Sequence, residues 1–302
     1  MSKKKKSKKG LVIGIAVVAI LAVGIAGASG SGDKDDSSKT KIVSANKSGG
    51  SEDNNETFTI DEQVLWEIDN VKITATGLDE DSLLGTQIKV LVENNSDKDI
   101  GISTDAVIVN DYMISDLTSM TVTAGNKSND NITLFSSELE AAGIDKIGKI
   151  ELYLHTFDPD TYDTLNKSEC ITIKTSEFEN MDTQNNIDGA TLFEQDGVKI
   201  VAQYVDDESF WGQAVLLYIE NNSQSDIIVQ CDDVSVNGYM VSALLSADVY
   251  AGKKSFDDIT LLQSDLDENG VTDIETIETS FRILDQDFNT IAESGKVSFS
   301  TK

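Results

Sequence analysis

The residues whose types and spacing best suit a metal ion lie near the carboxyl end of the chain. Oxygen-bearing side chains alternate there with other residues, in the order Asp265, Asp267, Asn269 and Asp273. With Gly270 between them, they match the first nine positions of an EF-hand loop, whose oxygen atoms bind calcium. The twelfth position, where such a loop needs a bidentate glutamate, is Thr276. The motif is therefore a candidate calcium site that lacks one ligand.

An interpretation without a metal accounts for the same segment. The sequence repeats with an offset of 127 residues, and the equivalent positions of the first copy hold two glutamates and an alanine. A short helix over 137–142, capped by Ser137 or Ser264 and ended by Gly143 or Gly270, explains both copies. We therefore expect a helix here and no cofactor, with calcium kept as the alternative.

A second acidic cluster is present in both copies. Residues 158–163 read DPDTYD, and residues 285–289 read DQDFN. Two or three carboxylates on one loop can hold a cation. Asp and Asn are also typical of hairpin turns, because their side chains bond to the neighbouring backbone. No clear bidentate glutamate accompanies either cluster, so the sequence favours turns.

The residue types on which most enzymes rely are scarce. His155 is the only histidine and stands in an expected strand, while Cys170 and Cys231 fall at non-equivalent positions of the two copies. These residues leave little for a nucleophile–histidine pair or a zinc site, and free thiols are expected. The chain has no G-x-S-x-G, P-loop, G-x-G-x-x-G or H-E-x-x-H motif. We predict that it is not an enzyme.

Two tyrosines are the aromatic residues best placed for a binding surface. Tyr112 and Tyr239 occupy the same position of the repeat, next to a hairpin turn. Aromatic side chains are common at contact surfaces because they combine a large apolar area with a polar tip. The sequence predicts that both tyrosines are exposed and bind a sugar or a protein.

The elements that must position these residues are short strands, repeated in two copies. Both copies contain the same three motifs: Glu-Asn-Asn-Ser at 93–96 and 220–223, Asn-x-Tyr-Met at 110–113 and 237–240, and Ala-Gly-x-Lys-Ser at 124–128 and 251–255. Nearly continuous apolar runs at 88–92 and 215–219 are typical of central strands. About eight or nine short strands per copy predict an all-β fold of two tandem antiparallel immunoglobulin-like sandwiches.

The order of the segments predicts an exported protein. Residues 1–10 carry six lysines, and residues 11–28 form an uncharged apolar run. As a helix this run spans about 27 Å, enough for a bilayer core, and the positive-inside rule places the lysines in the cytoplasm. We expect a retained transmembrane anchor. A signal peptide cleaved after Ala26-Gly27-Ala28 is the alternative.

A tether and two domains follow the anchor. Residues 29–57 are rich in Ser, Gly, Asp and Asn and contain too few apolar residues for a core, which is typical of a flexible tether. We place repeat 1 at 58–177 and repeat 2 at 187–302, with a mostly polar linker at 178–186.

The chain is strongly acidic. It has 24 Lys and Arg against 53 Asp and Glu, a formal net charge of −29. Because six of the lysines lie in the first ten residues, the remainder is more acidic still. Such a body repels phosphate backbones and anionic headgroups, so nucleic acid is not an expected partner.

With these features the chain resembles a class of exported proteins. A lysine-rich start, one apolar segment, a tether and Asn-Asn-Ser domains with an Asn-Gly-Tyr-Met hairpin are similar to membrane-anchored, telokin-like or immunoglobulin-like surface proteins of low-GC Gram-positive bacteria. The resemblance carries over no catalytic or binding residue. We expect a non-enzymatic cell-surface binding protein with its amino terminus in the cytoplasm and its repeats outside. Its partner would be a cell-envelope component or a protein. A calcium-dependent adhesion module that uses the acidic loops is the alternative.

Overall fold

Strands dominate the fold. The structure is a computed structural model that describes residues 58–80, 82–181, 187–206 and 212–301. The predicted all-β class is confirmed in these ranges, and residues 54–302 belong to one compact unit. No helix in the described ranges is long and apolar enough to cross a membrane. The expected anchor and tether lie outside these ranges.

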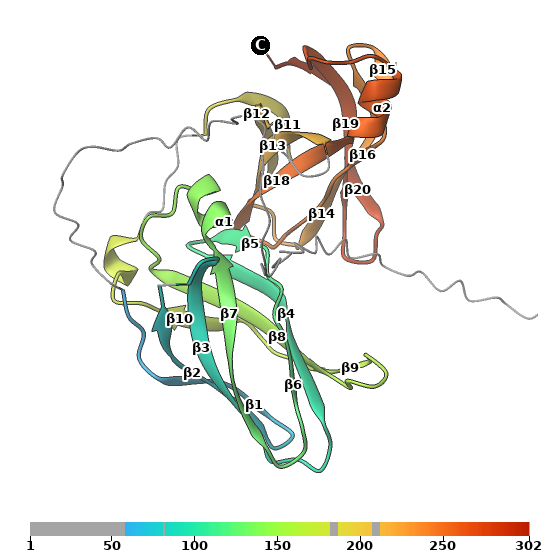
Figure 1. The fold of residues 1–302 in the computed structure, drawn as a ribbon. Helices are drawn as coiled ribbons and strands as arrows, with labels where there is room; N and C mark the ends of the chain where they lie inside the picture. Colours follow the sequence, from blue (N-terminus) through green and yellow to red (C-terminus); the bar gives the residue numbers. More distant parts are fainter. Residues whose placement is uncertain (1–57, 81, 182–186, 207–211, 302) are drawn as a thin grey trace, which may run out of the picture. The chain divides into compact units, whose positions relative to one another are not determined.

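Repeat 1 is built from two antiparallel sheets (Figure 1). One has the strand order β1-β2-β3-β7, and the other has the order β10-β8-β4-β5, with β6 beside β4 and β9 beside β8. The bounds of the elements are β1 Gln63–Ile68, β2 Val71–Asp79, β3 Gly85–Asn94, β4 Ile100–Val109, β5 Tyr112–Ile114, β6 Ser119–Val122, β7 Lys127–Phe135, α1 Ser136–Ala141, β8 Lys149–Phe157, β9 Thr164–Lys167 and β10 Ile171–Lys174. A 3-10 turn, η1 (Phe178–Asn180), follows.

Repeat 2 uses the same strand order. Its strands β11-β12-β13-β18, with β16 beside β18, continue through β18 into β5 of repeat 1, so that the two repeats share one 11-stranded sheet. Its other sheet is β15-β14-β19-β20 with β17 beside β14. The bounds are β11 Ala190–Gln195, β12 Val198–Asp206, β13 Gly212–Asn221, β14 Ile227–Val236, β15 Tyr239–Met240, β16 Ala243–Leu244, β17 Ser246–Val249, β18 Lys253–Leu262, α2 Gln263–Glu268, β19 Thr276–Leu284 and β20 Thr290–Ser300.

Tight turns set the register of the hairpins. Asp69-Asn70 has φ angles of 48° and 64°, and Asp196-Gly197 has φ angles of 52° and 85°. The turns at 110–111 and 237–238 are also left-handed at both residues. Two left-handed central residues are the signature of the two-residue hairpin turn that Asn, Asp and Gly favour. The sequence prediction of these hairpins is confirmed.

A buried asparagine at the same position supports each repeat. Asn94 and Asn221 are both 0% exposed. The Asn94 side chain donates to the backbone carbonyls of Lys98 and Val122 at 2.8 and 2.9 Å, and Asn221 makes the equivalent pair of bonds at 2.9 and 2.8 Å. Buried polar groups need such partners. The shared Glu-Asn-Asn-Ser motif therefore has a structural role.

The two short helices begin without the predicted caps. The N-cap residues of α1 and α2 are Phe135 and Leu262, and neither makes a side-chain cap hydrogen bond. Each helix starts directly after a strand, so Ser137 and Ser264 already lie within the first turn, and the prediction that they cap is wrong. The glycines after the helices have φ angles of 62° and 66°, as expected for helix-ending glycines.

Candidate functional site

Tyr112 is buried, so the prediction that it is exposed is wrong. It opens β5 and is 2% exposed. Its ring stacks on Phe256 of repeat 2, with ring centroids 5.7 Å apart and planes 10° apart. Burial, and then the charge of Glu220, raise the pKa of the Tyr112 hydroxyl to about 12. Tyr112 therefore belongs to a contact between the repeats.

The backbones of the two repeats also pair at this point. Strand β5 runs parallel to β18, with Tyr112 and Met113 opposite Lys254 and Ser255. The Lys254 N–H donates to the Asp111 carbonyl at 2.9 Å, and the Lys254 ammonium lies 5.2 Å from the centre of the Tyr112 ring, within cation–π range. We call this pairing the repeat contact. Its hairpin half is Tyr112–Met113 and its strand half is Lys254–Ser255.

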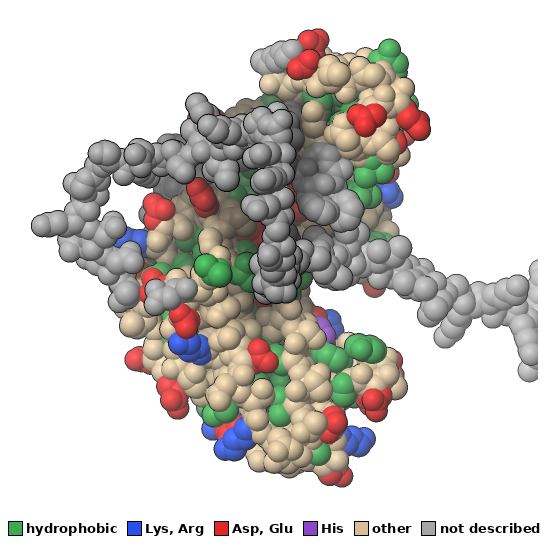
Figure 2. All heavy atoms as spheres, in the orientation of Figure 1, with side chains coloured by type: hydrophobic (Ala, Val, Ile, Leu, Met, Phe, Trp, Pro, Cys, Tyr) green, Lys and Arg blue, Asp and Glu red, His purple; other side chains and the backbone are tan. Residues whose placement is uncertain are grey.

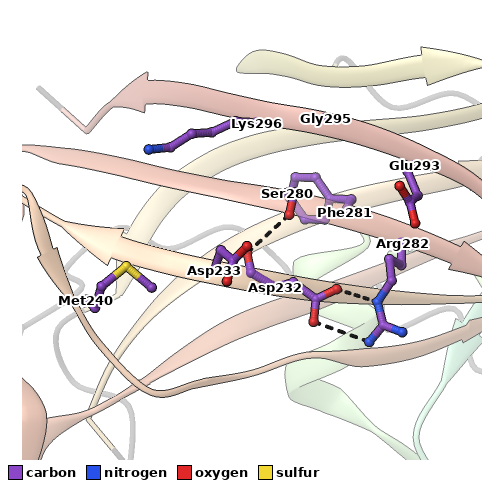
Figure 3. Close-up of a pocket in the computed structure, with 9 residues that line it drawn as sticks. All are labelled: Asp232, Asp233, Met240, Ser280, Phe281, Arg282, Glu293, Gly295 and Lys296. Carbon is purple, nitrogen blue, oxygen red and sulfur yellow. Dashed lines mark hydrogen bonds and ion pairs between the residues drawn. The ribbon is translucent and has the colours of Figure 1, made fainter.

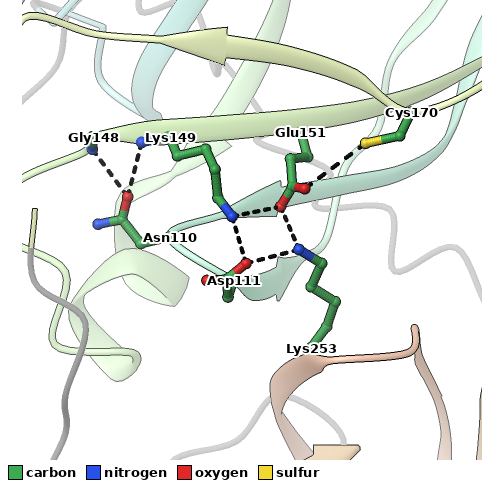
Figure 4. A network of polar contacts seen from close by, with 7 residues as sticks. All are labelled: Asn110, Asp111, Gly148, Lys149, Glu151, Cys170 and Lys253. Carbon is green, nitrogen blue, oxygen red and sulfur yellow. Dashed lines mark hydrogen bonds and ion pairs between the residues drawn. The ribbon is translucent and has the colours of Figure 1, made fainter. Parts of the chain in front are cut away.

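An ionic network flanks the repeat contact (Figure 4). The Lys253 ammonium lies 2.7 Å from the Asp111 carboxylate and also bonds to Glu151, and Lys149 reaches the same two carboxylates at 2.7 and 3.2 Å. Burial alone would lower the pKa of Lys253, but its two carboxylate partners outweigh burial and raise it. Burial would raise the pKa of Asp111, but its two lysine partners outweigh burial and lower it. Both shifts favour the charged forms of Lys253 and Asp111, which form an ion pair between the two repeats.

Tyr239, the equivalent residue of repeat 2, is exposed as predicted. It is 49% exposed, and the next residue, Met240, is 63% exposed. Met240 lines a groove of about 710 Å³ along β14, β19 and β20 (Figure 3). Within the groove Arg282 pairs with Asp232 through two hydrogen bonds. The hairpin half of repeat 2, Tyr239–Met240, is thus exposed, whereas Tyr112 in the hairpin half of repeat 1 is covered.

The candidate nucleophiles and bases lie apart. Cys231 is half-buried in β14, and burial raises the pKa of its thiol to about 11, so the reactive thiolate is scarce at neutral pH. Cys170 is an exposed free thiol beside the Glu151 carboxylate. His155 lies in β8 with its Nδ1 atom 2.8 Å from the Asp105 carboxylate. None of these contacts pairs a cysteine with the histidine.

The predicted calcium ligands are engaged in building and anchoring α2. The Asp265 carboxylate accepts a hydrogen bond from the Ser242 N–H at 2.7 Å, and Asp267 accepts one from a side chain one turn earlier at 2.8 Å. The Asn269 amide donates to the Asp265 carbonyl, and Asp273 lies beyond the helix. Across the described ranges, no three metal-ligating side chains are placed to hold an ion. The geometry favours the helix interpretation.

The second acidic cluster forms hairpin turns in both repeats, as the sequence favours. The Asp158 carboxylate accepts from the Asp160 N–H at 2.9 Å, and the Asp285 carboxylate accepts from the Asp287 N–H at 3.0 Å. Figure 1 shows the first of these turns between β8 and β9. The acidic side chains therefore shape the turns.

An exposed aromatic residue stands at each of these turns. Tyr162 and Phe288 have φ angles of 61° and 63° and are 77% and 60% exposed. A left-handed φ is rare for a bulky side chain and costs about 1–3 kcal/mol. Leu165 and Ile291, at equivalent positions three residues later, are 48% and 54% exposed. We call Tyr162 with Leu165, and Phe288 with Ile291, the tip pairs.

The tip pairs were not among the residues predicted from the sequence. The signal was present, since an aromatic residue recurs within the DPDTYD and DQDFN turns. The Asp and Asn residues explain both turns without reference to the aromatic side chains. Only the exposed fractions reveal that the aromatic side chains point outward.

Comparisons with known proteins give no family. No family model and no curated protein matches the chain. Among solved structures it is similar to the YadV chaperone (8% identity, 76% of this chain and 99% of that chain, TM-score 0.24) and to a complex of Salmonella enterica SafA pilin with the SafB chaperone (14%, 71% and 88%, 0.19). A protein of unknown function from Porphyromonas gingivalis is also similar (12%, 66% and 83%, 0.18). Similarity at these TM-scores carries no argument about function.

Proposed function

We propose that the chain is a non-enzymatic binding protein of the cell surface. In this proposal residues 11–28 anchor it in the membrane, residues 29–57 form a tether, and two immunoglobulin-like modules at 58–177 and 187–302 stand outside. The lysine-rich start and the apolar run support the anchor. The identical strand order of the two repeats supports tandem modules.

The observation that carries the proposal is the presence of a tip pair in each repeat. Both pairs combine an aromatic with an aliphatic side chain, both are exposed, and both aromatic residues have a left-handed backbone. Tyr162 stacks on Phe157, with ring centroids 6.0 Å apart, yet both aromatic side chains stay largely exposed, so burial within the repeat offsets little of the cost of that conformation. A role in binding explains why an aromatic residue occupies this turn in both repeats.

A carbohydrate polymer of the cell envelope is the ligand that best suits the tip pairs. Aromatic faces stack on the C–H faces of sugar rings, and nearby carboxylates accept hydrogen bonds from hydroxyl groups. Asp160 and Asp287 lie at equivalent positions of the two turns. Figure 2 shows acidic side chains scattered over the visible face, which disfavours strongly anionic ligands. A repeating polymer would also engage both tip pairs at once.

Co-sedimentation with purified cell-wall sacculi tests the proposal. The protein is a 54–302 fragment, which is one compact unit, mixed with sacculi at low and moderate salt. We expect saturable binding that survives moderate salt, because the tip contacts are largely apolar. Failure to bind at either salt concentration would overturn the envelope-ligand proposal.

A further inference from the structure

We propose that the chain assembles head to tail, because a second repeat contact can form between copies. The hairpin half of repeat 2, Tyr239–Met240, would pair in parallel with Lys127–Ser128 of another copy. This inference concerns a different surface from the tip pairs and does not rest on the proposed function.

Each repeat carries both halves of the repeat contact. Hairpin residues Tyr112 and Met113 recur as Tyr239 and Met240, and strand residues Lys254 and Ser255 recur as Lys127 and Ser128. The contact within the chain uses the hairpin half of repeat 1 and the strand half of repeat 2. One hairpin half and one strand half are therefore left over.

Both leftover halves are accessible. Tyr239 and Met240 are 49% and 63% exposed. Strand β7 is the last strand of the sheet β1-β2-β3-β7, and within the described residues it pairs only with β3. The Lys127 side chain is 60% exposed, although its ammonium also contacts Glu93. An open sheet edge of this kind is a template for another strand.

Within the shared hairpin motif, the asparagine makes the same contacts in both repeats, whereas the Tyr-Met pair does not. Asn110 accepts from the N–H groups of Gly148 and Lys149, and Asn237 makes the same kind of contact to residues 275 and 276. The asparagine is thus needed by both folds. The Tyr-Met pair is covered in repeat 1 and exposed in repeat 2, so the fold of repeat 2 gives no reason for it. A partner outside the chain gives that reason.

The contact between copies would be weaker than the contact within the chain. Three positions that strengthen the internal contact have changed, because Asp111, Lys253 and Phe256 correspond to Gly238, Asn126 and Asn129. The second contact thus loses the ionic bridge and the aromatic stack. It keeps the backbone pairing and the lysine beside the tyrosine ring. Because the two halves differ, each added copy leaves one half free, and such contacts build open chains.

Photo-crosslinking of the full chain tests where the copies meet. A photoreactive phenylalanine analogue replaces Met240, and the full-length protein is irradiated in membranes as a mixture of isotope-labelled and unlabelled copies. We expect mixed-label crosslinks to the peptide that contains Lys127 and Ser128, in a ladder of dimers, trimers and larger species. Crosslinks only to Lys254 of another copy would place the repeat 2 hairpin against repeat 2 of that copy and overturn the proposal. The absence of mixed-label crosslinks would do the same.

Variants separate assembly from misfolding. Tyr239→Asp should abolish the ladder, whereas Leu83→Asp, which alters an exposed apolar side chain outside the repeat contact, should leave it unchanged. Gly238→Asp combined with Asn126→Lys restores the ionic bridge and should strengthen association about tenfold. Equal ladders in all variants, or a ladder that stops at the dimer, would contradict head-to-tail assembly. Tyr239→Asp should still bind sacculi, because Tyr239 is not part of a tip pair. Sacculus binding measured for this variant therefore tests the proposed function separately from assembly.

Discussion

Tyr112 and Tyr239 occupy the same position of the repeat, yet Tyr112 is 2% exposed and Tyr239 is 49% exposed. The difference arises because Phe256 and Lys254 cover Tyr112, whereas within the described residues no equivalent pair covers Tyr239. One sequence motif therefore serves as an internal contact in one repeat and as a free surface in the other.

The same substitution should have opposite consequences at the two tyrosines. Tyr112→Ala removes a stacked, buried ring and should lower the free energy of unfolding by about 3 kcal/mol. Tyr239→Ala is the matched control and should change it by less than about 0.5 kcal/mol. Urea unfolding of the 54–302 fragment measures both. Equal losses would mean that the repeats do not meet at Tyr112.

The buried asparagine of repeat 2 should be essential for stability. Asn221→Ala removes the four hydrogen bonds that this side chain makes with two carbonyls and two donors, which should cost about 3 kcal/mol. Asn222→Ala alters the exposed neighbour in the same motif and should cost less than about 0.5 kcal/mol. Thermal unfolding of the two variants compares them. A small effect at Asn221 would refute its structural role.

The strands and turns could be predicted largely from local sequence. Asp69-Asn70 and Asp196-Gly197 identify their hairpins because few residues tolerate two successive left-handed positions. The apolar runs at 88–92 and 215–219 become β3 and β13, which lie inside their sheets. Strand β9 was not predicted, because its sequence TLNK has no clear apolar alternation.

The exposure of individual side chains could not be predicted in the same way. The burial of Tyr112 depends on Phe256, a residue 144 positions later whose counterpart in repeat 1 is Asn129. No periodicity within the β5 hairpin contains that information. The tip pairs are exposed for the converse reason, since no distant element of the described chain covers them, although Tyr162 stacks on Phe157 at the end of β8. Contacts between distant elements decide both cases.

Stability should fall as the pH rises towards 7. A cavity of about 210 Å³ between the repeats is lined by Glu138 and Asp257, among others. Burial raises the pKa of Asp257 to about 7; the Ser255 hydroxyl opposes this, and the carboxylates of Asp258, Glu138 and Asp248 add to it. The folded state therefore holds a proton between about pH 4 and 7 that the unfolded state releases.

The free energy of unfolding should accordingly decrease by up to about 1.4 kcal/mol per pH unit in that window and level off above it. Urea unfolding between pH 5 and 8 measures the slope. Asp257→Asn removes the titrating group and should flatten the curve. A wild-type curve that rises from pH 5 to 7, or an unchanged slope in the variant, would show that Asp257 is not the responsible group.

Calcium should not stabilise the protein. The carboxylates of Asp265 and Asp267 are already bonded within the fold, and the EF-hand pattern lacks its twelfth ligand. We expect the same Tm in millimolar calcium, in magnesium and in EDTA. A rise of several degrees in calcium alone, lost in Asp267→Asn, would instead support the calcium-dependent adhesion module.

The most direct test of the central claim, that the two tip pairs bind the cell envelope, is sacculus affinity measured for four proteins in parallel. These are the wild-type 54–302 fragment, Tyr162→Ala, Phe288→Ala and the double variant. The account predicts that each single variant binds at least about tenfold more weakly, because it loses avidity, and that the double variant does not bind. Tyr162 and Phe288 are exposed on turns, so all four proteins should have the same Tm. A double variant that binds sacculi as tightly as the wild type would contradict the account.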